Sequence, residues 1–152
     1  MRNSSDADPL ALEQQVCFAL AVASRTVVSV YRPVLEPLGL THPQYLVMLA
    51  LWGAEPLSLS ELSRRIELDP ATLSRLLKRL ETAGLLRRDR DPADERALAV
   101  ALTPRGRELR EQALAVPDTV VDRLGLDLDE LMALHARLTD VIAAAKQAVV
   151  AG

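Results

Sequence analysis

The stretch from Leu68 to Thr103 constrains the fold of this chain more than any other segment. Near its start lie Asp69, a good helix N-cap, and Pro70 at the first helical position. The N–H of a residue at that position forms no bond within the helix, so proline, which lacks the N–H, is well tolerated there. A helix is expected to run from there to about Ala83. Gly84 then suits the left-handed residue that commonly ends a helix. The segment therefore predicts a short helix with a well-defined start and stop.

A polar β-hairpin is expected directly after that helix. Leu85–Arg90 and Ala97–Leu102 have the composition of short strands, and the polar residues Asp91–Glu95 connect them. Farther upstream, two capping boxes open two more helices, Thr41–Gly53 and Ser58–Ile66. Three helices followed by a hairpin is the plan of a winged helix-turn-helix domain, whose last helix enters the DNA major groove. We therefore expect a mainly α fold with a small β-hairpin wing.

The expected recognition helix has two different faces. Leucines three or four residues apart form a stripe that should pack against the neighbouring helices: Leu73, Leu76, Leu77 and Leu80. The opposite face offers small side chains for close approach and long cations for base edges or phosphate. The candidate DNA-binding residues of this helix are Thr72, Ser74, Arg75, Lys78 and Arg79. Taken alone, a leucine-striped helix with cations opposite is also typical of an ordinary surface helix.

The charge distribution favours one DNA-facing surface. The chain has a net charge of -3, yet the segment Arg64–Arg90 carries more basic than acidic residues. Beyond it, Arg96 on the descending edge of the wing is expected to enter a narrow minor groove, with Asp94 holding its guanidinium in a fixed direction. Arg88 is a further candidate contact. The alternative for the wing is a turn rich in solvated charges.

Helices are also expected at both ends of the chain. The first runs from Pro9 to about Pro33, and another begins at Thr103-Pro104 and continues to about Val116. A last helix, Asp127 to about Val150, carries an apolar stripe that a partner chain could cover. A homodimer would place two recognition helices about one DNA turn apart, matching a pseudo-palindromic operator; the alternative is an intramolecular helical core. The expected domains are an N-terminal helix (1–40), a DNA-binding lobe (41–103) and C-terminal dimerisation helices (104–152).

Several classes of protein are excluded by what the sequence lacks. The polar segment Met1–Pro9 has no signal-peptide pattern and no apolar run is expected to cross a bilayer, so we expect a cytoplasmic protein with no membrane partner. A single cysteine excludes an intramolecular disulfide, and the two histidines give no zinc-ligand spacing, so no metal site is expected. Phosphate-cradling glycine loops, nucleophile elbows and paired-histidine motifs are missing, so we expect neither an enzyme nor a cofactor.

These residues resemble the MarR-type winged-helix repressors. The matching residues are Thr72, Arg75, Leu80, Glu81, Gly84, Leu85, Arg88 and the wing motif Asp91-x-x-Asp94-Glu95-Arg96. Within that family, Cys17–Phe18, Tyr31–Pro33 and Pro43–Leu46 are similar to the organic-hydroperoxide-sensing OhrR branch. The resemblance implies a dimer that represses a peroxide-detoxifying gene and leaves DNA when a cysteine near the start of the first helix is oxidised. That cysteine is Cys17.

The resemblance also implies a site around Cys17. A thiolate that attacks a peroxide oxygen gives sulfenic acid, so the site needs donors that stabilise the thiolate. Tyr31 is the expected phenol donor, His42 is a candidate replacement for a second phenol, and Ala21 stands where a further tyrosine is common. Because the chain has no second cysteine, the sulfenic acid is expected to condense with a low-molecular-weight thiol, form a sulfenamide or oxidise further.

Two alternatives to thiol sensing stay open. Cys17 can be a small apolar side chain without a redox role, in which case the fold suits a MarR-type repressor released by a small aromatic or anionic ligand. A thiol peroxidase that uses Cys17 is a third class, but its turnover would need a resolving thiol and would leave the basic wing unexplained.

Overall fold

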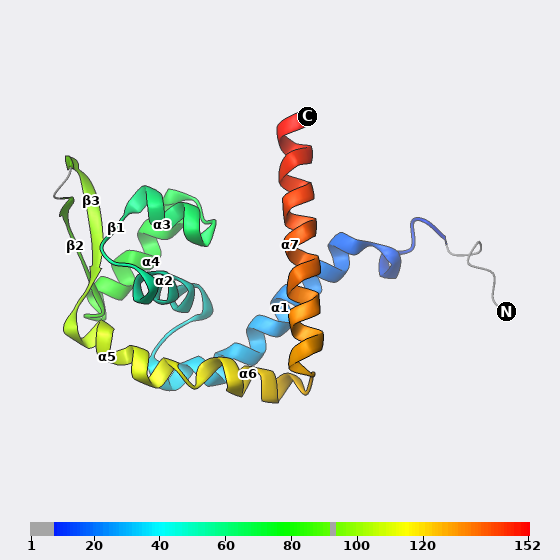
Figure 1. Ribbon diagram of the computed structural model, residues 1–152, viewed down its shortest axis with the longest axis horizontal. Helices are drawn as coiled ribbons and strands as arrows, with labels where there is room; N and C mark the ends of the chain where they lie inside the picture. The colour runs from blue at the N-terminus through cyan, green and yellow to red at the C-terminus, as the bar shows by residue number, and fades with distance from the viewer. Residues whose placement is uncertain (1–7, 92–93) are drawn as a thin grey trace. The chain divides into compact units, whose positions relative to one another are not determined.

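The computed structural model describes the backbone of residues 8–91 and 94–152, and the side chains of these residues outside 91–97. The chain is mostly helical with one three-stranded antiparallel sheet, which confirms the mainly α fold with a β-hairpin wing (Figure 1). It forms two compact units, residues 1–114 and 115–152. The first contains η1 (Leu12–Gln14), α1 (Val16–Leu35), η2 (Glu36–Leu38), α2 (His42–Gly53), β1 (Leu57–Ser58), α3 (Leu59–Ile66), α4 (Pro70–Thr82), β2 (Leu86–Asp91), β3 (Asp94–Leu102) and α5 (Pro104–Ala113). The second contains α6 (Val116–Leu124) and α7 (Leu128–Ala151).

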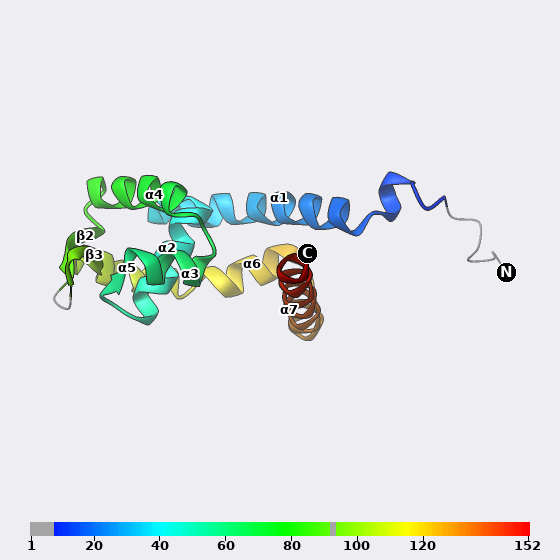
Figure 2. The same cartoon turned by 90° about the horizontal axis from the view of Figure 1, so that it is seen from above.

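α1 begins later and ends later than the sequence predicts. The Gln15 side chain donates to the carbonyl oxygens of Pro9 and Ala11, which stabilises a 3-10 turn before the regular helix. At the other end, α1 continues two residues past Pro33 and ends at Leu35. Figure 2 shows α1 as one long helix. Because proline removes only its own N–H bond, the last turn tolerates it, and Gly39 in the left-handed region ends the following 3-10 turn.

Side-chain caps define the starts of α2 and α3. The box at Thr41 is complete: Thr41 N–H donates to Gln44 Oε1 at 3.0 Å, and Gln44 N–H donates to Thr41 Oγ1 at 3.4 Å. The box expected at Ser58 is only half formed. Ser58 Oγ accepts from Glu61 N–H at 3.1 Å, but the Glu61 carboxylate turns to arginines of its own helix instead.

The wing is the β2–β3 hairpin, and a third strand extends its base. Strand order is β1-β3-β2, with all neighbours antiparallel. Both hairpin strands are longer than predicted: β2 includes Asp91 and β3 begins at Asp94, so these parts of the expected connection Asp91–Glu95 are strand. Residues 92 and 93 lie outside the described part of the chain. The sequence did not predict β1, whose Leu57 pairs with Val100. Gly84 has φ of 78°, which confirms its role in ending α4.

The start of α5 is packed tightly against the base of the wing. A Cβ on Gly106 would lie 2.0 Å from the Leu85 carbonyl oxygen, so only glycine fits. Its own carbonyl accepts a hydrogen bond from Trp52 Nε1 at 2.9 Å. Arg107 Nε donates to Glu55 Oε1 at 3.1 Å. These contacts fix α2, α5 and the wing base as one lobe around a core that includes Leu35, Met48, Leu51, Leu62, Leu73, Leu77, Leu80, Leu102 and Val100.

The second unit corrects one prediction and confirms another. The helix from Pro104 was expected to continue to Val116, but it ends at Ala113, and α6 begins at Val116. Pro117 lies in the first turn of α6, where proline favours the start of a helix. The last helix begins after Asp127 as predicted, with a complete capping box.

The N-terminal segment Val16–Leu38 is long and apolar enough to cross a membrane by length and composition alone. The expectation that no such run exists was therefore wrong by this criterion. One helix of this kind is weak evidence of a membrane span, because apolar helices of soluble proteins have the same character.

Candidate functional site

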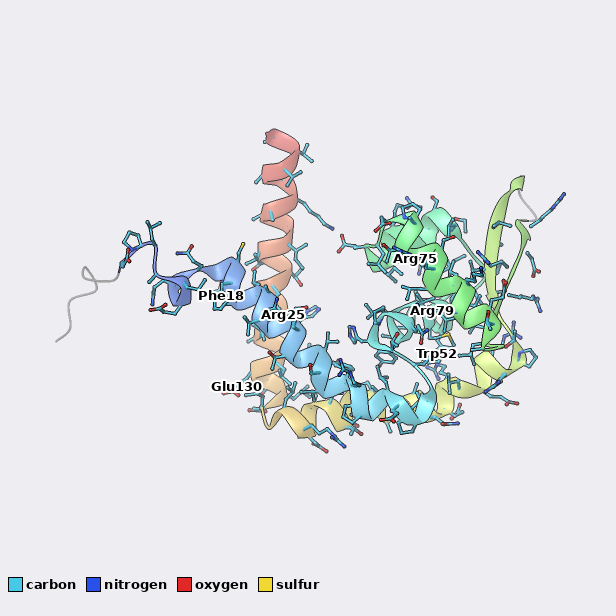
Figure 3. The ribbon with its side chains drawn as sticks, turned by 180° about the vertical axis from the view of Figure 1, so that it is seen from behind. Phe18, Arg25, Trp52, Arg75, Arg79 and Glu130 are labelled. Carbon is cyan, nitrogen blue, oxygen red and sulfur yellow. The ribbon has the colours of Figure 1, made fainter. Side chains whose placement is uncertain are left out.

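α4 presents its cations to solvent. Arg75, Lys78 and Arg79 are all exposed, whereas Leu73 and Leu77 are fully buried. Figure 3 shows Arg75 and Arg79 following one another along this helix. None of the three cations forms an ion pair with another residue that the structure describes. Their charges are therefore available to an external anion such as a DNA phosphate.

The smaller candidates on α4 lie closer to the core. Ser74 is half-buried beside the cations. The Thr72 hydroxyl donates to Asp69 Oδ2 at 2.7 Å, and the Thr72 N–H donates to Asp69 Oδ1 at 2.9 Å. The hydrogen bond from the Thr72 side chain, followed by that from its backbone, lowers the pKa of Asp69. Thr72 therefore completes the cap of α4, and its hydroxyl oxygen can still accept a bond from outside.

The wing candidates separate into a base and an edge. Arg88, on β2, donates from Nε to Glu81 Oε2 at 3.1 Å and is only 24% exposed. This ion pair ties the wing base to the end of α4. Asp94 and Arg96 lie within β3, and their side chains are outside the described residues.

The sequence prediction did not include two exposed arginines of α3. Arg64 and Arg65 both bond to Glu61, and Arg65 Nε lies 3.1 Å from Glu61 Oε1. The hydrogen bond from Arg65 and then the charge of Arg64 lower the pKa of Glu61. The spacing Glu-x-x-Arg-Arg could have signalled this arrangement, since residues three and four apart share a helix face. The helix before a recognition helix crosses the DNA backbone, so both arginines are candidate phosphate contacts.

Cys17 and Tyr31 do not meet within one chain. Cys17 is exposed in the first turn of α1. Tyr31 is on the same helix, and fourteen residues at about 1.5 Å each separate them by about 21 Å. The expected phenol donor therefore cannot reach this thiol unless it comes from a second copy of the chain.

Tyr31, His42 and Tyr45 form a ring cluster where α1 meets α2. The ring centroids of Tyr31 and His42 are 4.9 Å apart in an edge-to-face arrangement, and those of Tyr31 and Tyr45 are 6.1 Å apart. Burial lowers the pKa of His42, so at neutral pH the imidazole is an uncharged donor and acceptor. An uncharged His42 can offer an anion a hydrogen bond but no positive charge. Tyr45 was not among the predicted site residues, although its spacing of three from His42 on a helix could have indicated it.

A hollow of about 420 Å³ opens beside His42. Apolar side chains such as Val28 and Leu40 line it together with the charged residues Arg32 and Glu36. Its character suits a small ligand with an apolar body and one anionic group.

Comparisons with known proteins decide the family. Residues 40–98 match the model of the MarR family. The chain is 44% identical over 134 residues to the HTH-type transcriptional regulator TtmR of Methylorubrum extorquens, covering 88% of this chain and 69% of TtmR. This chain belongs to the MarR family. The MarR family is one of transcriptional regulators rather than enzymes, and this member is a DNA-binding regulator.

Further matches agree with this assignment. The MarR-family chain is 39% identical over 127 residues to the organic hydroperoxide resistance transcriptional regulator of Bacillus subtilis, covering 82% of this chain and 86% of that one. Its fold matches reduced AbfR bound to DNA, from Staphylococcus epidermidis, with a TM-score of 0.71 and 33% identity over 88% of this chain and 93% of AbfR. It also matches Bordetella bronchiseptica BpsR, whose DNA binding is regulated by 6-hydroxynicotinic acid, with a TM-score of 0.79 and 29% identity over 88% and 97%.

Proposed function

We propose that this protein is a cytoplasmic, homodimeric repressor that leaves a pseudo-palindromic operator when an organic hydroperoxide oxidises Cys17. The similarity to a hydroperoxide resistance regulator and to AbfR supports the proposal. The position of the thiol on α1 supports it independently.

The spacing of residues along α1 is the observation that carries the proposal. Cys17, Ala21, Ser24, Val28 and Tyr31 recur at steps of four and three, so they share one face of the helix. If two copies of α1 cross antiparallel at Ser24, each Cys17 lies beside the partner subunit's Tyr31, about 10 Å along the helix from the crossing. The small side chains of Ala21 and Ser24 allow the helices to approach closely at that point.

Exposed apolar surface supports a dimer that covers α1. Apolar side chains left in solvent over a long helix favour burial against a partner. On α1 these are Phe18, Leu20, Val22 and Val27, and Figure 3 labels Phe18 near the start of the helix. On α7 the predicted stripe is also exposed, at Leu128, Leu134, Val141 and Val149.

The proposed oxidation needs only groups already named. The Cys17 thiolate attacks one peroxide oxygen, an S–O bond forms, the O–O bond breaks, and the alkoxide leaves and takes a proton to become an alcohol. Sulfur is oxidised by two electrons and the peroxide is reduced. A low-molecular-weight thiol then condenses with the sulfenic acid, releasing water and leaving a mixed disulfide. Its added bulk between the α1 helices changes the spacing of the two DNA-binding lobes.

On DNA, the residues divide by role. Ser74, Arg75 and Lys78 face base edges in the major groove, with Thr72 beside them at the helix start. Arg79 and Arg88 contact the backbone. Arg96, oriented by Asp94, enters the flanking minor groove.

The test is operator release by the parent protein and by Cys17→Ser. A duplex selected from random DNA by the reduced protein serves as the operator in a gel shift. Cumene hydroperoxide with free cysteine should release the parent, and dithiothreitol should restore binding, whereas Cys17→Ser should stay bound throughout. Release of Cys17→Ser by the oxidant would contradict the proposal.

The hollow beside His42 favours a second candidate, a repressor released by a small aromatic carboxylate. Arg32 and the uncharged His42 could bind the carboxylate while Val28 and Leu40 contact the ring. BpsR, with its 6-hydroxynicotinic acid, is a fold neighbour of this kind. Under reducing conditions, release of Cys17→Ser by such a ligand, but not of Arg32→Ala in the same background, would favour this function over thiol chemistry.

A further inference from the structure

Tyr45 is a buried residue with an unusual hydroxyl. It is only 4% exposed, yet no residue that the structure describes forms a hydrogen bond with its hydroxyl group. Buried polar groups in folded proteins are as a rule hydrogen-bonded. In the described part of the chain, every fully buried side-chain polar atom has a hydrogen-bond partner. Because the Tyr45 hydroxyl has no such partner, it keeps some contact with solvent. The hydroxyl therefore lies where a group from outside the chain can meet it.

The ring contacts place Tyr45 beside the proposed sensor residues. Its ring centroid is 6.1 Å from that of Tyr31 and 6.5 Å from that of His42. The chain has only two tyrosines, and both belong to this cluster. Burial, and then the neighbouring Tyr31 phenol, raises the pKa of Tyr45. At neutral pH the hydroxyl therefore keeps its proton and is a donor.

We propose that Tyr45 donates a hydrogen bond to the partner subunit's Cys17 thiolate, as a positioning residue of the sensor site. This inference rests on the proposed function. Such a bond stabilises the thiolate over the thiol and so favours the form of the sulfur that attacks a peroxide. Tyr45 thus supplies a phenol in a chain where Ala21 offers no donor.

Tyr45→Phe tests the inference, because it removes the hydroxyl and keeps the buried ring. In the full-length dimer, titration of the thiolate absorbance near 240 nm should show the Cys17 midpoint raised by about one unit. At a pH one unit below the parent midpoint, the thiolate fraction of Tyr45→Phe is about tenfold lower than that of the parent. The more basic thiolate of the variant is about threefold more nucleophilic. Oxidation of the variant by cumene hydroperoxide should therefore be about threefold slower. Thr82→Val, which removes an exposed hydroxyl of α4, should change neither quantity.

The variant should also bind operator as tightly as the parent when reduced, since a purely structural defect would weaken binding as well. An unchanged midpoint and an unchanged rate in a folded dimer would overturn the inference. Failure of the proposed function is seen separately, because it would show as peroxide release of Cys17→Ser.

A second measurement does not depend on how Tyr45→Phe folds. In Tyr31→Phe, Tyr45 is the only tyrosine of the chain, so incorporated 3-fluorotyrosine gives a single fluorine resonance. That resonance should shift when Cys17 passes from thiol to thiolate, and the shift should vanish in the Cys17→Ser background. A resonance that does not respond to Cys17 would contradict the bond.

Discussion

At the scale of single residues, Gly106 connects the base of the wing to α2 through close packing and a hydrogen bond. Its missing side chain lets α5 touch the Leu85 carbonyl, and its own carbonyl accepts the Trp52 indole N–H. The sequence offered no sign of this, because Gly106 lies in the first turn of a helix, where glycine is usually unfavourable. The constraint comes from a segment far away along the chain.

We predict that Gly106→Ala lowers the free energy of unfolding by about 1–3 kcal/mol, since the new methyl group would clash with backbone that must move. Urea denaturation of the reduced protein measures the loss. Gly53→Ala is the matched control, because a Cβ there meets nothing within 4 Å, and it should be neutral or slightly stabilising. Equal effects of the two substitutions would contradict the packing described for Gly106.

His42 gives a prediction about pH. Burial lowers its pKa in the folded state, so the unfolded chain takes up the proton first as the pH falls. The contribution of His42 to stability is therefore complete above its ordinary pKa of about 6.5 and is lost as the pH falls from there toward the folded-state pKa. Unfolding by urea at pH 7.5 and pH 5.5 should show a larger loss for the parent than for His42→Gln. Equal losses would mean that the imidazole does not titrate differently in the two states.

At the scale of elements, α4 is expected to discriminate between DNA sequences, whereas the wing is expected to bind DNA of any sequence. Arg75→Ala should weaken operator binding by tenfold or more and relax preference at one base position, since a bidentate base contact discriminates by about 1–3 kcal/mol. Arg96→Ala should weaken binding to all sequences and reduce the slope of log affinity against log salt by about one. Anisotropy titrations at several salt concentrations measure both. The groove assignment fails if both variants bind like the parent.

Local signals predicted most elements of the lobe, and the misses have physical causes. Caps at Thr41, Asp69 and Thr103 fixed helix starts correctly, because a capping side chain acts on N–H groups only two or three residues away. β1 is held by pairing with β3, a contact between distant segments that leaves no local pattern. The site was predicted only in part for a similar reason: Cys17 and Tyr31 suggested a single pocket, but one straight helix keeps them apart.

At the scale of the whole molecule, the proposed sensor site needs two chains. In the antiparallel register centred on Ser24, position 31 of one chain faces Cys17 of the other. Tyr31→Cys should therefore form a covalent dimer under mild oxidation, visible on a non-reducing gel. Arg32→Cys, one residue farther and about 100° around the helix, should not. Equal cross-linking of both variants, or none with Tyr31→Cys, would contradict this register.

The central claim is that oxidation of Cys17 is the event that releases DNA. The most direct test follows operator anisotropy and the intact mass of the protein in one titration with cumene hydroperoxide and free cysteine. The account predicts that the released fraction rises in step with the fraction of chains carrying a cysteine adduct at Cys17, and that dithiothreitol reverses both. Release without modification of Cys17, or full modification without release, would contradict it.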